Sequence, residues 1–264
     1  MPVRLLLILC LCAGSAKAGE EFDHTLWNQL LQAHVKVLAG GQATQVDYRG
    51  MQEDKAELRA YLAAAATVSE SDFESWSKDA QLAFLINLYN AATVDLVAHN
   101  LPGIDSIRDL GTLFRSPWKQ PIVSLFGGQV SLDEIEHDLI RDSGNFREPR
   151  IHFAVNCAAI GCPPLRAEAY IGARLSAQLE DNTRLFLSDR SRNYTRDGRL
   201  YVSRIFDWYA IDFKQSWQGV DSIADFLLRY VDVLGLNPRE QQALKDGDLP
   251  LRYDRYDWGL NSVR

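Results

Sequence analysis

The most apolar stretch of the chain, residues 79–100, predicts a helix that other elements must surround. Asp79 and Asp95 are its only formally charged side chains. At 100° per residue, its apolar side chains cover nearly the whole circumference, which is typical of a helix buried on most sides. Asn87 and Asn90 lie on one narrow arc of this helix, and buried amides must be hydrogen-bonded. These amides either tie down a neighbouring loop or line a pocket.

The rest of the chain predicts shorter elements around this helix. The spacing of apolar residues predicts helices at 21–39, 52–66, 69–76, 131–141, 169–187, 222–233 and 238–245. Extended segments are predicted at 46–48, in a hairpin over 122–130, and at 151–156, 200–203 and 251–256. We therefore expect an α+β fold, predominantly helical, with a small antiparallel sheet and a buried central helix. In this sheet the hairpin lies with the strands at 151–156 and 200–203.

The first eighteen residues have the pattern of a signal peptide. Arg4 gives a short basic start, residues 5–13 are apolar, and residues 16–18 form a small-residue cleavage site. The apolar run is too short to span a bilayer, so no transmembrane segment is expected. The pattern predicts a periplasmic or secreted protein that is cleaved near Ala18 and forms a single domain over residues 19–264.

Charge narrows the range of partners. Loss of Arg4 and Lys17 leaves 26 basic residues against 35 acidic ones, which is a net charge of −9. A chain this acidic is a poor partner for nucleic acid or anionic lipid. We expect a small molecule, a peptide or a protein as the partner, and we expect no cofactor.

Residues 150–166, RIHFAVNCAAIGCPPLR, hold one of the five histidines and both cysteines that remain after cleavage. Alternating apolar residues predict a strand here, with His152 and Asn156 on its less apolar face. Cys157 would open a short helical turn capped by Asn156, where the helix dipole favours a thiolate. Along an extended strand, His152 and Cys157 lie on the order of 15 Å apart, so His152 is a poor base for this thiol.

Cys157 and Cys162 also have the spacing of a local disulfide. In an oxidising compartment two cysteines five residues apart often pair. The bond would rigidify the turn and remove the free nucleophile, so a structural disulfide and a reactive thiol remain alternatives.

A second group of titratable side chains lies on the helix predicted at 131–141. Ser131 and Glu134 form a capping box at its start. Glu136 falls inside the apolar stripe of this helix, and His137 lies at its margin. An inward carboxylate is unfavourable unless it is paired. Glu136 is therefore either half of a structural ion pair or an acid whose pKa is shifted for catalysis.

Five motifs occur along the chain in a fixed order. They are AFLINLYNAATV at 83–94, SLDEIEHDLIR at 131–141, RIHFAVNCAAIGCPPLR at 150–166, VSRIFDWYAIDF at 202–213 and YDWGLN at 256–261. Together they resemble an uncharacterised family, domain of unknown function 547, from about Val46 to Asn261. The family has no firmly assigned activity, and fusions of its members to glutaredoxin-like or leucine-zipper segments indicate thiol or assembly contexts. The positions that match are Asn87, Asn90, Glu136, His137, His152, Asn156, Cys157 and Cys162.

Three functions are compatible with these residues. In a thiol-dependent hydrolase or transferase, Cys157 is the nucleophile, His137 is the base and Glu136 orients it. The side chains with binding roles in such a site are Asn87, Asn90, His152 and Asn156.

The alternatives need no nucleophile. In a non-enzymatic binding or assembly module, Cys157 and Cys162 form a structural disulfide and a surface groove binds the partner. In a metal site, the ligands would come from His137, His152, Glu136 and Cys157. These ligand types suit zinc, but their spacing matches no compact zinc motif, so no metal is assigned.

Overall fold

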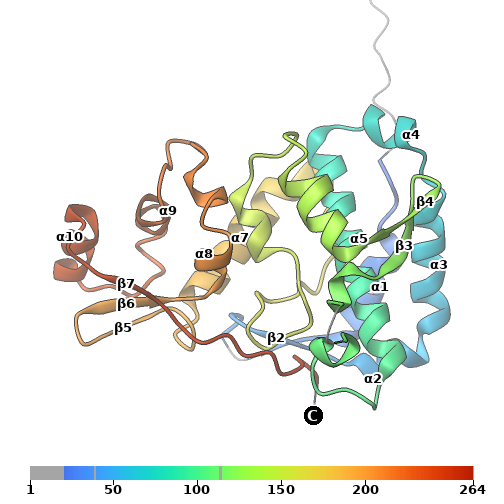
Figure 1. Cartoon of the computed structure of the whole chain (residues 1–264), viewed down its shortest axis with the longest axis horizontal. Coiled ribbons are helices and arrows are strands. Elements are labelled where there is room, and N and C mark those ends of the chain that lie inside the picture. Colours follow the sequence, from blue (N-terminus) through green and yellow to red (C-terminus); the bar gives the residue numbers. More distant parts are fainter. Residues whose placement is uncertain (1–20, 39, 113–114, 264) are drawn as a thin grey trace, which may run out of the picture.

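The computed structural model describes residues 21–38, 40–112 and 115–263; the predicted signal peptide lies outside them. Helices dominate the described residues, as predicted, in an α+β fold (Figure 1). The α-helices are α1 (Thr25–His34), α2 (Tyr48–Glu53), α3 (Lys55–Ala66), α4 (Glu70–Ser75), α5 (Lys78–Asn100), α6 (Leu132–Glu134), α7 (Leu175–Ser188), α8 (Ile205–Trp208), α9 (Ile223–Arg229) and α10 (Pro238–Asp246). The strands are β1 (Val35–Val37), β2 (Thr44–Val46), β3 (Pro121–Leu125), β4 (Gly128–Ser131), β5 (Tyr194–Arg196), β6 (Arg199–Val202) and β7 (Leu251–Tyr253).

Helix α5 is the buried central helix that the sequence predicts. Its N-cap Ser77 accepts a hydrogen bond from the Ala80 N–H, and every side chain from Ala80 to Val94 is buried. By length and apolar composition α5 could cross a membrane, but 83% of that span is buried inside the protein. Such burial is typical of a core helix.

The strands form separate small sheets, so the prediction of one sheet is wrong. Strands β1 and β2 pair antiparallel, and so do β3 and β4. The predicted hairpin is therefore present, but Leu125 pairs with Gly128, so its turn is Phe126-Gly127 and lies one residue before the predicted Gly127-Gly128 turn. Strand β6 pairs antiparallel with β5 and parallel with β7. The hairpin and the strand β6 therefore never meet in one sheet.

The strand predicted at 151–156 is also wrong, because Pro149–Phe153 form a 3₁₀ helix, η4. A proline in the first turn favours a helix over a strand. Ile151 and Val155 pack in one core cluster with α5, whereas Phe153 packs in a second cluster with α7, α8 and α9. The apolar alternation divides these side chains between two cores and not between the two faces of a strand.

The residues after β7, 254–263, return from the C-terminal sheet to the N-terminal sheet, and we call them the C-terminal tail (Figure 1). The backbone N–H groups of Ile160 and Gly161 each donate to a carbonyl of this tail at 2.8 Å. Val46 of β2 donates to the Asn261 carbonyl at 2.8 Å. The tail therefore lies against both the cysteine turn and β2.

Candidate functional site

A cavity of about 220 Å³ brings together side chains that are distant in the sequence. Five of the residues singled out in the sequence line it, namely Glu136, His137, His152, Cys157 and Cys162. Asn87, Asn90 and Asn156 are not among its described lining residues.

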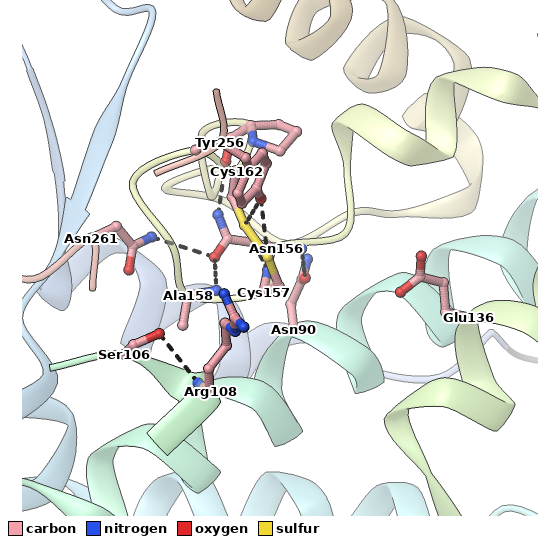
Figure 2. Close-up of a disulfide and its surroundings, with 12 residues drawn as sticks. Asn90, Ser106, Arg108, Glu136, Asn156, Cys157, Ala158, Cys162, Tyr256 and Asn261 are labelled. Carbon is pink, nitrogen blue, oxygen red and sulfur yellow. Dashed lines mark hydrogen bonds between the residues drawn. A yellow bond between two sulfur atoms is a disulfide. The ribbon is translucent and has the colours of Figure 1, made fainter. Parts of the chain in front are cut away.

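The cysteine turn forms one wall of the cavity. Cys157 and Cys162 are paired as a disulfide with their Cα atoms 6.3 Å apart (Figure 2). Cys157 N–H donates to the Cys162 sulfur at 3.0 Å. The Tyr256 hydroxyl lies 3.2 Å from the Cys157 sulfur and 3.1 Å from the Cys162 sulfur. One phenol therefore contacts both sulfur atoms.

The helical turn predicted at Cys157 is absent from the described structure. Ala158 has a φ of 63°, a left-handed conformation that ends any right-handed helix. The Asn156 side chain accepts from Ala158 N–H at 2.9 Å, which stabilises a local turn in place of a helix cap. The helix-dipole argument for a Cys157 thiolate is therefore wrong.

Gly161 lets the C-terminal tail approach this turn. A Cβ atom at Gly161 would lie 2.9 Å from three carbons of the Tyr256 ring, closer than packed carbon atoms come. The absence of a side chain at this position places the Tyr256 hydroxyl over the sulfur pair.

Glu136 faces the cavity from a different element. Helix α6 opens with the predicted Ser131 capping box and continues as a π-helical segment, η3 (Ile135–Arg141). The Glu136 side chain is 6% exposed, and the Tyr209 hydroxyl donates to its carboxylate at 2.6 Å. Burial raises the pKa of Tyr209, and so does the Glu136 charge, so this phenol stays protonated as a donor. Figure 2 shows Glu136 apart from the sulfur pair, on the neighbouring helix.

His137 and the cysteines have separate partners. Arg141 donates to His137 Nδ1, and His137 Nε2 lies 3.7 Å from Asp133. A guanidinium can only donate, so the Nδ1 lone pair is occupied. No hydrogen bond between His137 and Cys157 occurs in the described part of the chain, and this geometry leaves His137 poorly placed to deprotonate that thiol.

His152 takes part in a buried ion network. Its Nε2 lies 2.6 Å from Asp212, which also accepts from Arg141 Nε at 2.6 Å. Burial alone would raise the pKa of Asp212, but the hydrogen bonds from His152 and Arg141 lower it to about 2. Burial lowers the pKa of His152 despite the nearby carboxylate, so we assign a neutral ring that donates from Nε2. His152 Nδ1 is buried without a hydrogen-bond partner.

The side-chain amides of the three asparagines are hydrogen-bonded to backbone groups of neighbouring segments. Asn87 donates to the Tyr170 carbonyl at 2.7 Å and accepts from the Tyr170 N–H at 3.0 Å. Asn90 donates to the Ala154 carbonyl at 3.0 Å and accepts from the Asn156 N–H at 2.8 Å. These bonds tie the segments before and after the cysteine turn to α5.

Aromatic rings cover the cavity wall next to the disulfide. Tyr256 contacts Trp258 and Trp208, with ring centroids 4.6 and 4.9 Å apart, and Trp118 lies 5.7 Å from Trp258. The Tyr209 ring stacks on His152, with the ring centroids 3.9 Å apart. The cavity lining therefore combines aromatic rings with the polar side chains of Glu136 and His152.

The charge of the lining is negative. Asp133 and Glu136 both line the cavity, and its described lining residues include no lysine or arginine. The residues proposed as a zinc site share this cavity, but within 21–38, 40–112 and 115–263 no three His, Cys, Asp or Glu side chains are grouped to hold a metal.

The family assignment follows from the segment that carries most of this site. Residues 73–187 match the family model of DUF547, described as a protein of unknown function. This match supports the assignment of the chain to that family. No curated protein matches the chain, and no solved structure matches it. The matched segment contains α5, η3 and the cysteine turn, whereas the motifs at 202–213 and 256–261 lie outside it.

The sequence did not single out the aromatic half of the site. Tyr209 and Trp208 come from the motif at 202–213, and Tyr256 and Trp258 come from the motif at 256–261. The available signal was the density of aromatic residues in these two motifs. Core packing produces the same density, so the sequence alone does not separate the two explanations.

Proposed function

We propose that this chain is an exported binding protein whose cavity takes a small organic cation, with the disulfide as part of its wall. The observation that carries the proposal is a buried carboxylate, Glu136, in a cavity that tryptophan and tyrosine rings also line. Export is supported by the leader pattern at residues 1–18 and by paired cysteines, which persist in oxidising compartments.

The charges around the cavity favour a cationic ligand. Glu136 is buried with a neutral phenol, Tyr209, as its donor, and a buried carboxylate is unfavourable without a counter-charge. Arg141 is close enough to interact electrostatically with Glu136, but Asp212 binds it through two nitrogens. Asp133 adds a further negative charge to the lining. A bound ammonium group would therefore supply the charge that the site lacks.

The shape of the cavity suits a compact ligand. Aromatic faces attract cations by about 0.5–2 kcal/mol for each favourable ring. A cavity of about 150 Å³ holds benzene, so the 220 Å³ found here would take a ligand only slightly larger. Trp208 is 44% exposed beside this cavity, and Trp118 and Trp258 provide further indole faces.

A thiol-dependent hydrolase receives less support from these contacts. The sulfur of Cys157 lies next to Cys162 and the Tyr256 hydroxyl, and His137 is bound by Arg141. A disulfide sulfur has no thiolate to attack a carbonyl.

The test compares three probes of one shape and different charge. Choline, 3,3-dimethylbutan-1-ol and 3,3-dimethylbutanoate are titrated into the protein by calorimetry and by tryptophan fluorescence. We expect choline to bind about tenfold or more tightly than the neutral alcohol, because one desolvated cation–π contact is worth roughly 1–2 kcal/mol. The anion should bind most weakly.

Charge-matched variants locate the site. Glu136→Gln should weaken choline binding about tenfold, since it removes the buried charge but keeps an acceptor for Tyr209. Asp138→Asn removes the same charge from an exposed position of η3 outside the described lining and should leave binding unchanged. Equal binding of all three probes, or equal effects of both substitutions, would contradict an organic-cation site.

A further inference from the structure

We propose that the Cys157–Cys162 disulfide is a reactive centre that exchanges with small thiols entering the cavity. Cys157 is the sulfur attacked, and Cys162 is the thiolate that leaves. This activity goes beyond ligand binding, because it makes the cavity wall a reactant.

The two cysteines differ in exposure. Both cysteines line the cavity, but Cys157 is partly exposed whereas Cys162 is only 4% exposed. Exchange requires in-line approach of a thiolate to a sulfur atom. A thiolate that enters the cavity therefore meets Cys157 first.

The hydrogen bonds favour cleavage in the same direction. The Cys162 sulfur accepts from the Cys157 N–H at 3.0 Å and from the Tyr256 hydroxyl at 3.1 Å. Donors that face a sulfur favour its thiolate form, and a thiol with a lower pKa leaves faster. The Cys157 N–H therefore points at the atom on which negative charge develops, and the Tyr256 hydroxyl is within hydrogen-bond distance of the same atom.

The turn is held by contacts that do not involve the sulfur–sulfur bond. Arg192 donates to the Gly161 carbonyl at 3.2 Å and to the Cys162 carbonyl at 2.5 Å. The Asn156 amide donates to the Pro163 carbonyl at 2.7 Å. These bonds keep the two sulfurs near each other after reduction, which allows the disulfide to form again.

The exchange reaction uses an external thiol as the co-reactant. A thiolate forms a bond with the Cys157 sulfur, the Cys157–Cys162 bond breaks, and Cys162 leaves with the electron pair as a thiolate. A second thiolate then attacks the added sulfur and releases Cys157. Two external thiols are oxidised to one disulfide, and the protein disulfide is reduced to two thiols.

The lining charge selects among thiols, and this part of the inference rests on the organic-cation site. Glu136 and Asp133 favour an aminothiol, whose ammonium group pairs with a carboxylate while its sulfur approaches Cys157. They disfavour a thiol that carries a carboxylate. The substrate class is therefore a small aminothiol.

The first experiment measures exchange in the native, full-length mature protein. The protein is equilibrated in cysteamine–cystamine buffers, quenched with acid, alkylated and analysed by mass spectrometry. We expect reversible conversion between the disulfide and two thiols without denaturant. A disulfide that is reduced only when the protein is unfolded would overturn the proposal.

Variants test the direction of attack. With Cys162→Ala, the remaining Cys157 should react with a pyridyl disulfide at least tenfold faster than Cys162 does in the Cys157→Ala protein. Faster reaction at Cys162 would reverse the assignment and overturn the proposal. In Cys157→Ala, the pH dependence of alkylation should place the Cys162 pKa below about 8.5, the ordinary value for a thiol.

Tyr256→Phe removes the hydroxyl and keeps the ring that packs on Gly161. Exchange should slow about tenfold, because a hydrogen bond to a charged group contributes roughly 1.5 kcal/mol or more. The control is Tyr48→Phe, which removes another buried hydroxyl that binds the C-terminal tail away from the sulfurs. If both substitutions slow exchange equally, the phenol over the sulfurs has no special role and the proposed leaving-group mechanism is wrong.

Charge selectivity is measured separately from exchange itself. Rates per thiolate for cysteamine, 2-mercaptoethanol and 3-mercaptopropionate should fall in that order. Exchange with equal rates for all three thiols would support the reactive disulfide and contradict the organic-cation site. No exchange with any of them, alongside selective choline binding, would overturn the reactive disulfide alone.

Discussion

His24 lies among aromatic side chains, and only 4% of its surface is exposed. Its Nδ1 is 2.9 Å from the Tyr61 hydroxyl, and its ring centroid is 5.1 Å from that of Phe22. Burial lowers the pKa of His24 to about 4 from 6.5, and the charge of Asp23 opposes this shift only in part. Below pH 6.5 the unfolded chain therefore binds a proton here that the folded protein does not.

Because folding lowers the pKa of His24, the stability of the folded protein decreases in acid. Its contribution to the free energy of unfolding is complete above about pH 6.5 and is lost as the pH falls towards 4, by about 2 kcal/mol between pH 7 and pH 5. His24→Gln keeps a polar partner for Tyr61 without titrating, so its stability should change less over this range. His152, whose pKa burial also lowers, leaves part of the acid sensitivity in place.

Urea denaturation at pH 7 and pH 5 measures this difference. His99→Gln is the control, since His99 is exposed on α5, and its profile should follow that of the unmodified protein. Parallel pH profiles for His24→Gln and the unmodified protein would show that His24 does not titrate as described.

Single residues also mark the limit of what the sequence could predict about the site. Glu136 was recognisable as an inward carboxylate because its position on a helix follows from local spacing. Its donor, Tyr209, lies 73 residues away in the sequence and carries no local signal of that contact. The residue type was predictable, whereas its partner depended on tertiary packing.

At the scale of elements, the sequence predicted structure correctly where a few neighbouring residues determine it. The Ser131 capping box occurs as predicted, and the predicted hairpin occurs with its turn one residue earlier, at Phe126-Gly127, because each feature is complete within a short segment. The segment η4 was predicted wrongly, because its apolar residues pack into two separate core clusters. The parallel pairing of β6 with β7 could not be predicted locally either, since Leu200 pairs with Leu251.

The Ser131 capping box can be used to test whether choline binding depends on the position of η3. The Ser131 hydroxyl accepts from Glu134 N–H at 3.1 Å, and the Ser131 N–H donates to the Glu134 carboxylate at 2.7 Å. Ser131→Ala should lower the free energy of unfolding by about 1 kcal/mol. It should also weaken choline binding several-fold, because the helix that carries Glu136 starts here.

A cap outside the cavity provides the control. Ser222 caps α9 by accepting from Asp225 N–H at 3.0 Å, and α9 contributes no residue to the described lining. Ser222→Ala should lower stability by a similar amount in urea denaturation and leave choline binding unchanged. Equal weakening of binding in both variants would mean that binding follows global stability and not the position of η3.

At the scale of the whole molecule, the C-terminal tail connects parts that the sequence places far apart. It pairs with β2 at one end, lies against the cysteine turn in its middle, and follows directly from β7. Asn261 is 5% exposed at the centre of these contacts. Its Oδ1 accepts from the Tyr48 hydroxyl at 2.7 Å, and its amide donates to Asn156 at 3.4 Å (Figure 2).

Asn261→Ala should therefore loosen two distant segments together. The Tyr48 hydroxyl is buried and would lose its acceptor, which costs about 1–3 kcal/mol in the free energy of unfolding. Hydrogen exchange should become faster both in β2 and at Ala158–Gly161, because the tail binds both. Ser262→Ala, which removes only a local bond to the Val263 carbonyl, should leave both segments protected. Faster exchange confined to the tail would show that β2 and the cysteine turn are held independently of it, and the turn would then depend on its contacts with α5, Asn182 and Arg192.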